Sequence, residues 1–87
     1  MIGVVDSNGN VVNNNTIYGY SGIPFADGIV LVGASYNVVS GNAVSGYGSV
    51  GIFLDSASNS NAGINKVTPT NITTPLSNSG SGNTVTV

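Results

Sequence analysis

The chain has 87 residues and a formal net charge of -2 at pH 7, and only 5% of its residues are charged. Lys66 is the single cation, so the chain lacks the several Lys and Arg residues that nucleic-acid binding requires. The absence of Cys and His excludes disulfide frameworks, zinc sites and catalysis by either residue. The hydrophobic fraction of 40% is compatible with one packed domain.

The longest apolar run, residues 29–32, is far shorter than the ~20 residues that a membrane-spanning helix requires. We therefore expect no membrane span. The chain starts without a basic stretch, so no signal peptide is visible in it.

The first expected element is a short strand, Ile2-Gly-Val4, which leads into the turn sequence Asp6-Ser-Asn-Gly9. A second apolar stretch follows in Asn10-Val-Val-Asn-Asn-Asn15-Thr-Ile17. Around residues 21–27, Pro24 argues against a continuous β ladder. We expect a protruding loop there.

Both elements then recur. The strand motif returns as Ile29-Val-Leu31 and Ile52-Phe-Leu54, each opened by a glycine. The Asn motif returns in residues 37–44 and more weakly in residues 60–67. Its central Asn is Asn15, Asn42 or Asn65, at intervals of 27 (42 − 15) and 23 (65 − 42) residues. Recurrence at an interval of about two dozen residues is typical of a repeat fold.

A fourth copy begins at Gly82-Asn83-Thr-Val85, only 18 residues (83 − 65) after Asn65. The shorter interval also contains Pro69 and Pro75, which interrupt strand pairing. The last coil is therefore expected to be contracted or capped.

Stacked copies share one continuous core, whereas a strand of three to five residues cannot bury its apolar side alone. The repeat predicts an all-β fold, a parallel β-helix (solenoid) of three to four coils of roughly 23 residues each. The single domain would contain coils at approximately 1–27, 28–50 and 51–73, with a partial coil at 74–87. The predicted inward columns are Ile2/Ile29/Ile52, Val4/Leu31/Leu54, Val12/Val39/Ala62 and Ile17/Val44/Val67/Val85.

Two polar or aromatic columns accompany the apolar ones. The first is a structural ladder at the bend, in which each Asn bonds the backbone and the Asn of the next coil. Its predicted members are Asn15, Asn42, Asn65 and Asn83. A ligand-binding row is the alternative, but the Asn residues lie where every coil must turn. Tyr20 and Tyr47 are 27 residues apart and are predicted to stack as a ring pair, either at the edge of the core or in contact with a glycan.

The phrases Gly28-Ile-Val-Leu-Val-Gly-Ala-Ser-Tyr-Asn37-Val-Val-Ser-Gly-Asn42-Ala-Val44 and Gly51-Ile-Phe-Leu-Asp-Ser-Ala-Ser resemble the pectate-lyase-like β-helix repeat. That repeat is shared by NosD-type periplasmic copper-processing proteins, pectinolytic enzymes, surface-layer proteins and phage tailspikes. The resemblance is strongest in residues 28–59 and weak after residue 68. It implies a right-handed coil and specifies no chemistry.

Enzymes that this resemblance includes act on polysaccharides through clustered Asp residues, often with calcium and a basic residue. Asp6, Asp27 and Asp55 are the only acids here. The repeat places Asp6 and Asp55 in adjacent columns two coils apart, at a separation of about 10 Å. That value is near the upper end of the ~6.5–9.5 Å range of inverting glycosidases.

The alternative for these residues is that each Asp follows a strand and caps a turn. The chain has no Arg to neutralise an acidic substrate, and its three acids do not converge as a calcium site requires. Asp6 and Asp55 therefore remain weak catalytic candidates, and no metal or cofactor is expected.

Three to four coils at ~4.8 Å each form a stack only about 17 Å tall, so two open ends dominate. Few charged residues protect those ends from pairing with another strand. We expect the ends to contact further coils of a longer parent, a second copy stacked head to tail, or the other chains of a tailspike-like trimer.

The sequence thus favours a non-catalytic structural and interaction module of an extracellular, cell-surface or virion assembly. It would be a fibre subunit or tailspike-like fragment that contacts polysaccharide. The alternative is a fragment of a polysaccharide lyase or glycoside hydrolase whose catalytic coils lie outside this chain.

Overall fold

A computed structural model describes residues 1–87 as ten β-strands with no helix. No segment is therefore a helix of the length and apolarity needed to cross a membrane. All strand-to-strand pairing is parallel. The strands are β1 (Ile2–Val5), β2 (Val11–Asn13), β3 (Thr16–Gly19), β4 (Phe25–Val32), β5 (Val38–Ser40), β6 (Ala43–Leu54), β7 (Ala62–Ile64), β8 (Lys66–Val67), β9 (Asn71–Asn78) and β10 (Thr84–Thr86).

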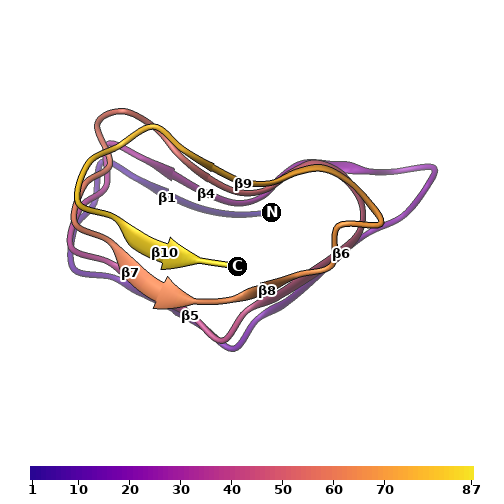
Figure 1. Ribbon diagram of the computed structural model, residues 1–87, viewed down its shortest axis with the longest axis horizontal. Helices are drawn as coiled ribbons and strands as arrows, with labels where there is room; N and C mark the ends of the chain where they lie inside the picture. Colours follow the sequence, from indigo (N-terminus) through magenta and orange to yellow (C-terminus); the bar gives the residue numbers. More distant parts are fainter.

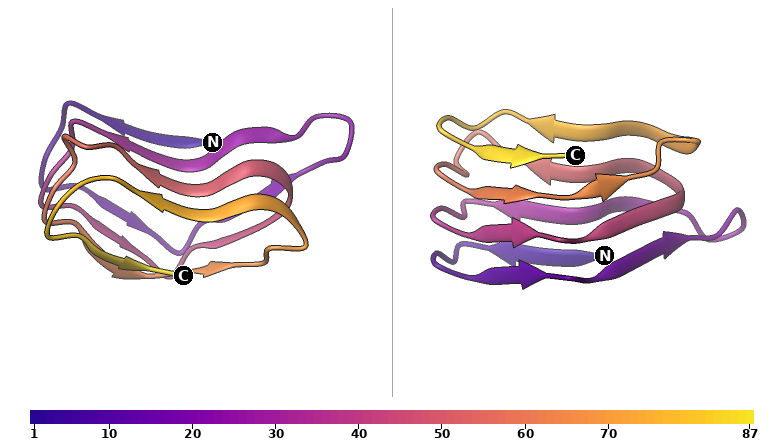
Figure 2. Two further views of the ribbon diagram at one scale, coloured as in Figure 1. Left: turned by 45° about the horizontal axis from the view of Figure 1, so that its top comes forward. Right: turned by 60° about the horizontal axis from the view of Figure 1, so that its bottom comes forward.

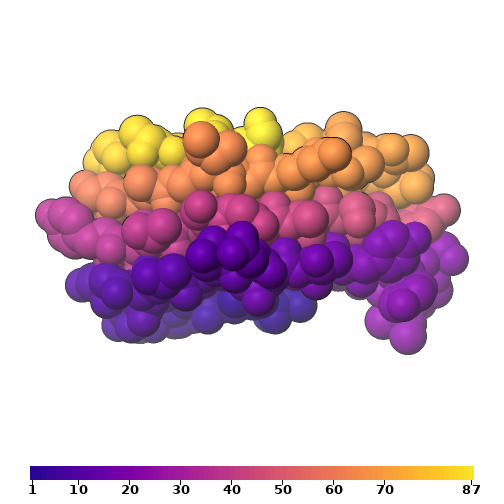
Figure 3. Space-filling model, turned by 90° about the horizontal axis from the view of Figure 1, so that it is seen from below, coloured from indigo at the N-terminus to yellow at the C-terminus, as the bar shows by residue number.

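The chain winds as a β-solenoid of about four turns, which confirms the predicted fold class. In Figure 1 the path runs leftward along β4, turns downward and returns along β5, with later coils nearer the viewer. This counterclockwise advance toward the viewer is a right-handed winding. Figures 2 and 3 show the coils as successive layers from the indigo N-terminal end to the yellow C-terminal end.

Each full coil contributes to three faces. The first face contains β1, β4, the second part of β6, and β9, and the second contains β2, β5, β7 and β10. The third contains β3, the first part of β6, and β8. Strand β6 bends between faces, since Ala43–Gly46 pairs with β3 whereas residues 48–54 pair with β4.

Aliphatic columns on the first face fill the interior as predicted. Ile2 lies beside Ile29, Ile29 beside Ile52, and Ile52 beside Leu76. Val4, Leu31 and Leu54 form the parallel column one step along. Within the two middle coils these side chains are fully buried. Stacking of similar side chains therefore produces one continuous core, as the repeat requires.

The predicted column Val12/Val39/Ala62 is correct for its first pair and wrong for its third member. Val12 lies beside Val39, but Val38 lies beside Ala62, so Ala62 is exposed and Gly63 continues the inward column. The third coil has a shorter second face, because Asn65 follows Asn61 by four positions whereas Asn42 follows Asn37 by five. The sequence alignment on Asn65 therefore placed the second-face residues of the third coil one position out of register.

Val85 is the second correction. It lies beside Gly63 on the second face and does not continue the column of Val44 and Val67 on the third face. The motif around it resembles the Asn motifs at both corners of a coil. The 18-residue interval therefore joined Asn65 at one corner to Asn83 at the other.

The protruding loop exists, but it is shorter than predicted. The Ile23 N–H donates to the Tyr20 carbonyl at 3.1 Å, which closes a tight turn. β4 already begins at Phe25, and Asp27 pairs with Val50, so residues 25–27 belong to the ladder. Figure 1 shows the remaining excursion extending beyond the body of the solenoid. The ladder resumes early because the Phe25 side chain packs against the core.

Candidate functional site

One row of stacked Asn side chains lies at the corner between the first and second faces. Asn37 donates its backbone N–H and its Nδ2–H to Asn61 Oδ1, both at 2.9 Å. The same two bonds link every neighbouring pair in this row. Its members, here called row 1, are Asn10, Asn37, Asn61 and Asn83.

A second row, row 2, lies at the corner between the second and third faces and consists of Asn15, Asn42 and Asn65. These three were predicted to bond one another, and they do. Asn83 was predicted as the fourth member, which is wrong, because it bonds Asn61 in row 1. The Thr86 carbonyl accepts the Asn65 N–H at 2.9 Å in its place.

Row 1 went unrecognised in the sequence, although a signal for it was present. Asn10 and Asn37 each precede Val-Val, and Asn61 precedes Ala-Gly at the matching position. With two rows to a coil, the Asn before a strand recurs twice per turn. Only the interval of 22 residues from Asn61 to Asn83, against 18 from Asn65, separates the two assignments.

Hydrogen bonds within the chain saturate the interior amides. The second Nδ2–H of Asn42 donates to the Val12 carbonyl at 3.0 Å, and that of Asn61 donates to the Ala34 carbonyl at 2.9 Å. No buried side-chain polar atom lacks a partner. The interior Asn residues thus have a structural role that uses their full bonding capacity.

The two candidate catalytic acids lie on either side of one glycine in the coil between them. Asp55 Oδ1 accepts the Gly33 N–H at 3.1 Å, and a Cβ added to Gly33 would fall 2.5 Å from Asp6 Oδ1. Asp27 is not part of this arrangement, because it lies beside Val50 near the other end of β4. The structure therefore brings Asp6 and Asp55 toward one position and leaves Asp27 apart.

The Asp55 carboxylate is engaged in its own turn. It accepts the Ser58 hydroxyl at 2.8 Å and the Ala57 N–H at 3.2 Å. The Ser58 hydrogen bond, followed by that of the Gly33 amide, lowers the pKa of the Asp55 carboxyl. A general acid of a glycosidase instead requires a raised pKa. The surface has no enclosed pocket.

The exposed tyrosines pair differently from the prediction. Tyr18 and Tyr20 form a T-shaped pair with ring centroids 5.1 Å apart, whereas Tyr47 lies beside Asn71. The predicted Tyr20–Tyr47 stack is therefore wrong, because the turn from Tyr20 to Ile23 leads the chain away from the solenoid. In Tyr18-Gly-Tyr20 the two tyrosines are two residues apart, so both rings point to the same, outer side of the strand. This spacing is a sequence signal from which the Tyr18–Tyr20 pair could have been predicted.

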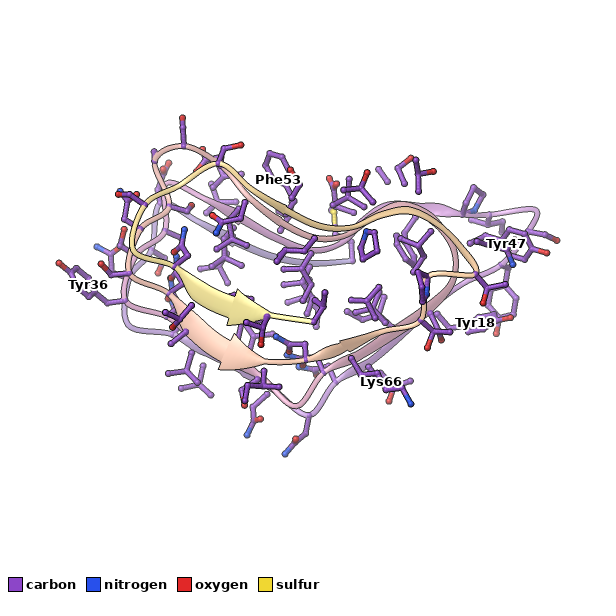
Figure 4. All side chains as sticks on the ribbon, viewed as in Figure 1. Tyr18, Tyr36, Tyr47, Phe53 and Lys66 are labelled. Atoms are coloured by element: carbon purple, nitrogen blue, oxygen red, sulfur yellow. The ribbon has the colours of Figure 1, made fainter.

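These rings lie at one end of the cross-section. Figure 4 shows Tyr18 and Tyr47 projecting from the corner between the third and first faces, with Tyr36 at the opposite end. Tyr20 is 68% exposed. We call Tyr18, Tyr20 and Tyr47 the tyrosine corner. It offers exposed aromatic surface with a phenol hydroxyl on each ring.

Comparison with known proteins identifies one relationship. Residues 2–87 match the family model described as periplasmic copper-binding protein (NosD). No curated protein and no solved structure was found to match. Copper sites use imidazole, thiolate or thioether ligands. The chain has one Met, no Cys and no His, and no three acidic residues gather in it, so the residues present do not fit a copper site.

Proposed function

Because the chain belongs to the NosD family, we propose that it is a non-catalytic structural and interaction module that works outside the cytoplasm. The observation that carries this proposal is the engagement of Asp55, whose carboxylate holds the turn that follows β6. A carboxylate held by three donors in its own fold suits turn formation better than proton transfer to a substrate.

The proposed location rests on the family description, which places its members in the periplasm. A periplasmic or extracellular location fits that description. The comparisons lend no support to a virion or tailspike origin.

Incubation with a panel of neutral and acidic polysaccharides tests the absence of catalysis. New reducing ends and unsaturated products are measured over time, with Asp6→Asn and Asp55→Asn variants as controls. We expect no product from the unchanged protein. A product that either substitution abolishes would contradict the proposal and favour the enzyme-fragment alternative.

The tyrosine corner supports a finer proposal, contact with a neutral glycan. The T-shaped contact between Tyr18 and Tyr20 fixes two exposed rings, and exposed rings can stack against the apolar faces of sugars. Lys66 is the only cation of the chain, so an acidic glycan would find little charge complementarity.

Binding to soluble starch, xylan and β-glucan by affinity electrophoresis tests this contact. Replacement of both rings, Tyr18→Ala with Tyr20→Ala, is expected to weaken binding about tenfold. Tyr36→Ala is the matched control, because Tyr36 is also exposed but lies at the opposite end of the cross-section. Equal loss in both variants, or no binding by the unchanged protein, would contradict glycan contact at this corner.

The remaining partner that we propose is a further β-coil at an open end of the solenoid. Each end coil has strands that pair on one side only, such as β1 and β9 on the first face. Such edges accept additional strands in parallel.

A further inference from the structure

The N-terminal end presents unused hydrogen-bond acceptors. Inside row 1, Asn37 Oδ1 accepts the N–H and Nδ2–H of Asn10 at 2.7 and 3.0 Å. Each Oδ1 in a row thus serves the coil that precedes it. Asn10 Oδ1 and Asn15 Oδ1 accept no hydrogen bond in the chain. Both rows therefore end here in an acceptor suited to two N–H donors.

The apolar columns also begin at this end with residues that are slightly more exposed than their neighbours in the second coil. Their first members are Ile2, Val4, Val12 and Ile17. Val4 is 8% exposed, whereas Leu31 beside it is 0% exposed. Val12 and Ile17 show the same difference from their neighbours in the second coil. A further coil with aliphatic residues in these columns would remove the remaining exposure.

At the C-terminal end, Asn78 ends both row 1 and one apolar column. Asn78 lies beside Leu54, where it ends the aliphatic column in a polar side chain. Its Oδ1 accepts the Gly80 N–H at 3.2 Å and the Asn83 Nδ2–H at 2.9 Å. Interior Asn residues make that second bond to the next coil, so Asn78 takes the place of an additional Asn in row 1. Pro75 in the same edge strand removes one backbone donor.

We propose that the N-terminal end is a docking surface for the C-terminal coil of another, uncapped parallel β-helix. The docking coil runs in the same direction and has Asn at both corner positions, which donate N–H and Nδ2–H to Asn10 Oδ1 and Asn15 Oδ1. It has aliphatic residues in the four columns. This inference rests on the proposed function and adds the polarity and chemistry of the partner.

A second copy of this chain does not meet that description. Head-to-tail stacking in register would place Asn78 of one copy against Val4 of the next, because Asn78 and Val4 occupy opposite ends of one column. The Nδ2–H of Asn83 is also already bonded to Asn78. Asn78 therefore opposes self-stacking, and the docking coil comes from a helix without such a cap.

Two extended chains test the difference between the ends. The first has a copy of residues 28–50 ahead of residue 1 and Met1→Gly, since Gly28 and Gly51 occupy the position equivalent to Met1. The second has a copy of residues 43–65 after residue 87 and Val87→Asn, since residue 87 is equivalent to Asn65. Both additions have 23 residues and preserve the register.

Thermal unfolding followed by circular dichroism provides the measurement. The N-terminal addition is expected to raise Tm by about 10 °C, and the C-terminal addition by no more than about 3 °C. Asn37→Ala and Asn42→Ala in the added N-terminal coil should remove about half of its effect. Asn78→Leu in the C-terminally extended chain should restore a rise similar to that at the other end. Equal stabilisation at both ends without Asn78→Leu would overturn the inference.

Sedimentation of chains without an addition is an independent test. The unchanged chain should stay monomeric at high micromolar concentration, whereas a folded Asn78→Leu variant should associate head to tail. Head-to-tail association of the unchanged chain would disprove the cap, and a folded, monomeric Asn78→Leu variant would disprove the docking surface. Neither result bears on catalysis, so the polysaccharide assay still tests the proposed function separately.

Discussion

The two Asn corners and the third corner turn the same chain by different means. At the Asn corners, buried amides bond each coil to the next, as Asn37 does with Asn61. At the third corner, Gly19 lies beside Gly46, which has a φ of 85°, and the two backbones lie in direct contact. The third coil passes this corner with Pro69 and no glycine.

This contrast explains where the repeat length varies. From row 1 to row 2 the chain takes five, five and four residues, because a stacked amide row tolerates little change in spacing. From row 2 across the third corner to the next Ile or Leu of the first face, it takes 14, 10 and 11 residues. Corners made by side-chain rows maintain the register, and the corner made by backbone contact accepts insertions.

The largest expected effect is at an interior Asn. Asn61→Ala removes four side-chain hydrogen bonds, two donated to Ala34 and Asn83 and two accepted from Asn37. The free energy of unfolding should fall by about 4 kcal/mol in urea titrations. Asn15→Ala, at the half-buried start of row 2, should cost only about 1 kcal/mol. Equal losses would show that position within a row does not matter.

A backbone contact at the third corner should be next in size. Gly46→Ala requires an L side chain at positive φ, and its Cβ would overlap the Gly19 carbonyl. We expect a loss of about 3 kcal/mol by the same titration. Gly22→Ala is the control, since no atom lies within 4 Å of its added Cβ, and it should change stability by less than about 0.5 kcal/mol. A harmless Gly46→Ala would refute the role of this contact.

Insertions compare the two kinds of corner directly. Four Gly-Ser residues added after Gly22 lengthen a loop that already projects from the solenoid, at a cost of about 0.5 kcal/mol. The same residues added after Gly41 separate Asn42 from β5, the strand that precedes it. The free energy of unfolding should then fall by about 2 kcal/mol or more. If both insertions cost the same, the proposed division between corners fails.

The smallest effect concerns Asp55 and depends on pH. Its folded-state pKa is lowered by the Ser58 and Gly33 hydrogen bonds, so the unfolded chain binds a proton more readily. The stabilisation is therefore complete above the ordinary Asp pKa of about 4 and is lost as pH falls through the lower folded pKa. Comparison with Asp55→Asn should show an advantage at pH 7 that vanishes in strong acid. An advantage independent of pH would exclude the carboxylate as its source.

Much of the fold could be predicted because similar side chains recur at a nearly constant interval. The columns from Ile2 and Val4 follow from residues that differ little from coil to coil. The predictions failed where one Asn motif resembled another, as at Asn83, and where the third coil lost one residue between Asn61 and Asn65. Sequence periodicity identifies the repeat, but hydrogen bonding decides which of two equivalent Asn residues continues a row.

The functional residues were less accessible to sequence reasoning for a physical reason. The Tyr20–Tyr47 pair assumed that the coil continues in register, whereas the turn ending at Ile23 redirects the chain after Gly19. The lowered pKa of the Asp55 carboxyl depends on donors from two coils, which spacing alone does not reveal. Turns therefore determine the placement of these two groups, whereas the repeat determines the interior.

The amide rows have a consequence for the medium in which such a protein works. Asn side chains bear no net charge, so dissolved salt does not screen the bonds between coils. The same amides do not titrate, so mild acidity or alkalinity leaves coil spacing intact. A protein with such rows therefore keeps the same coil spacing in surroundings whose salt content varies.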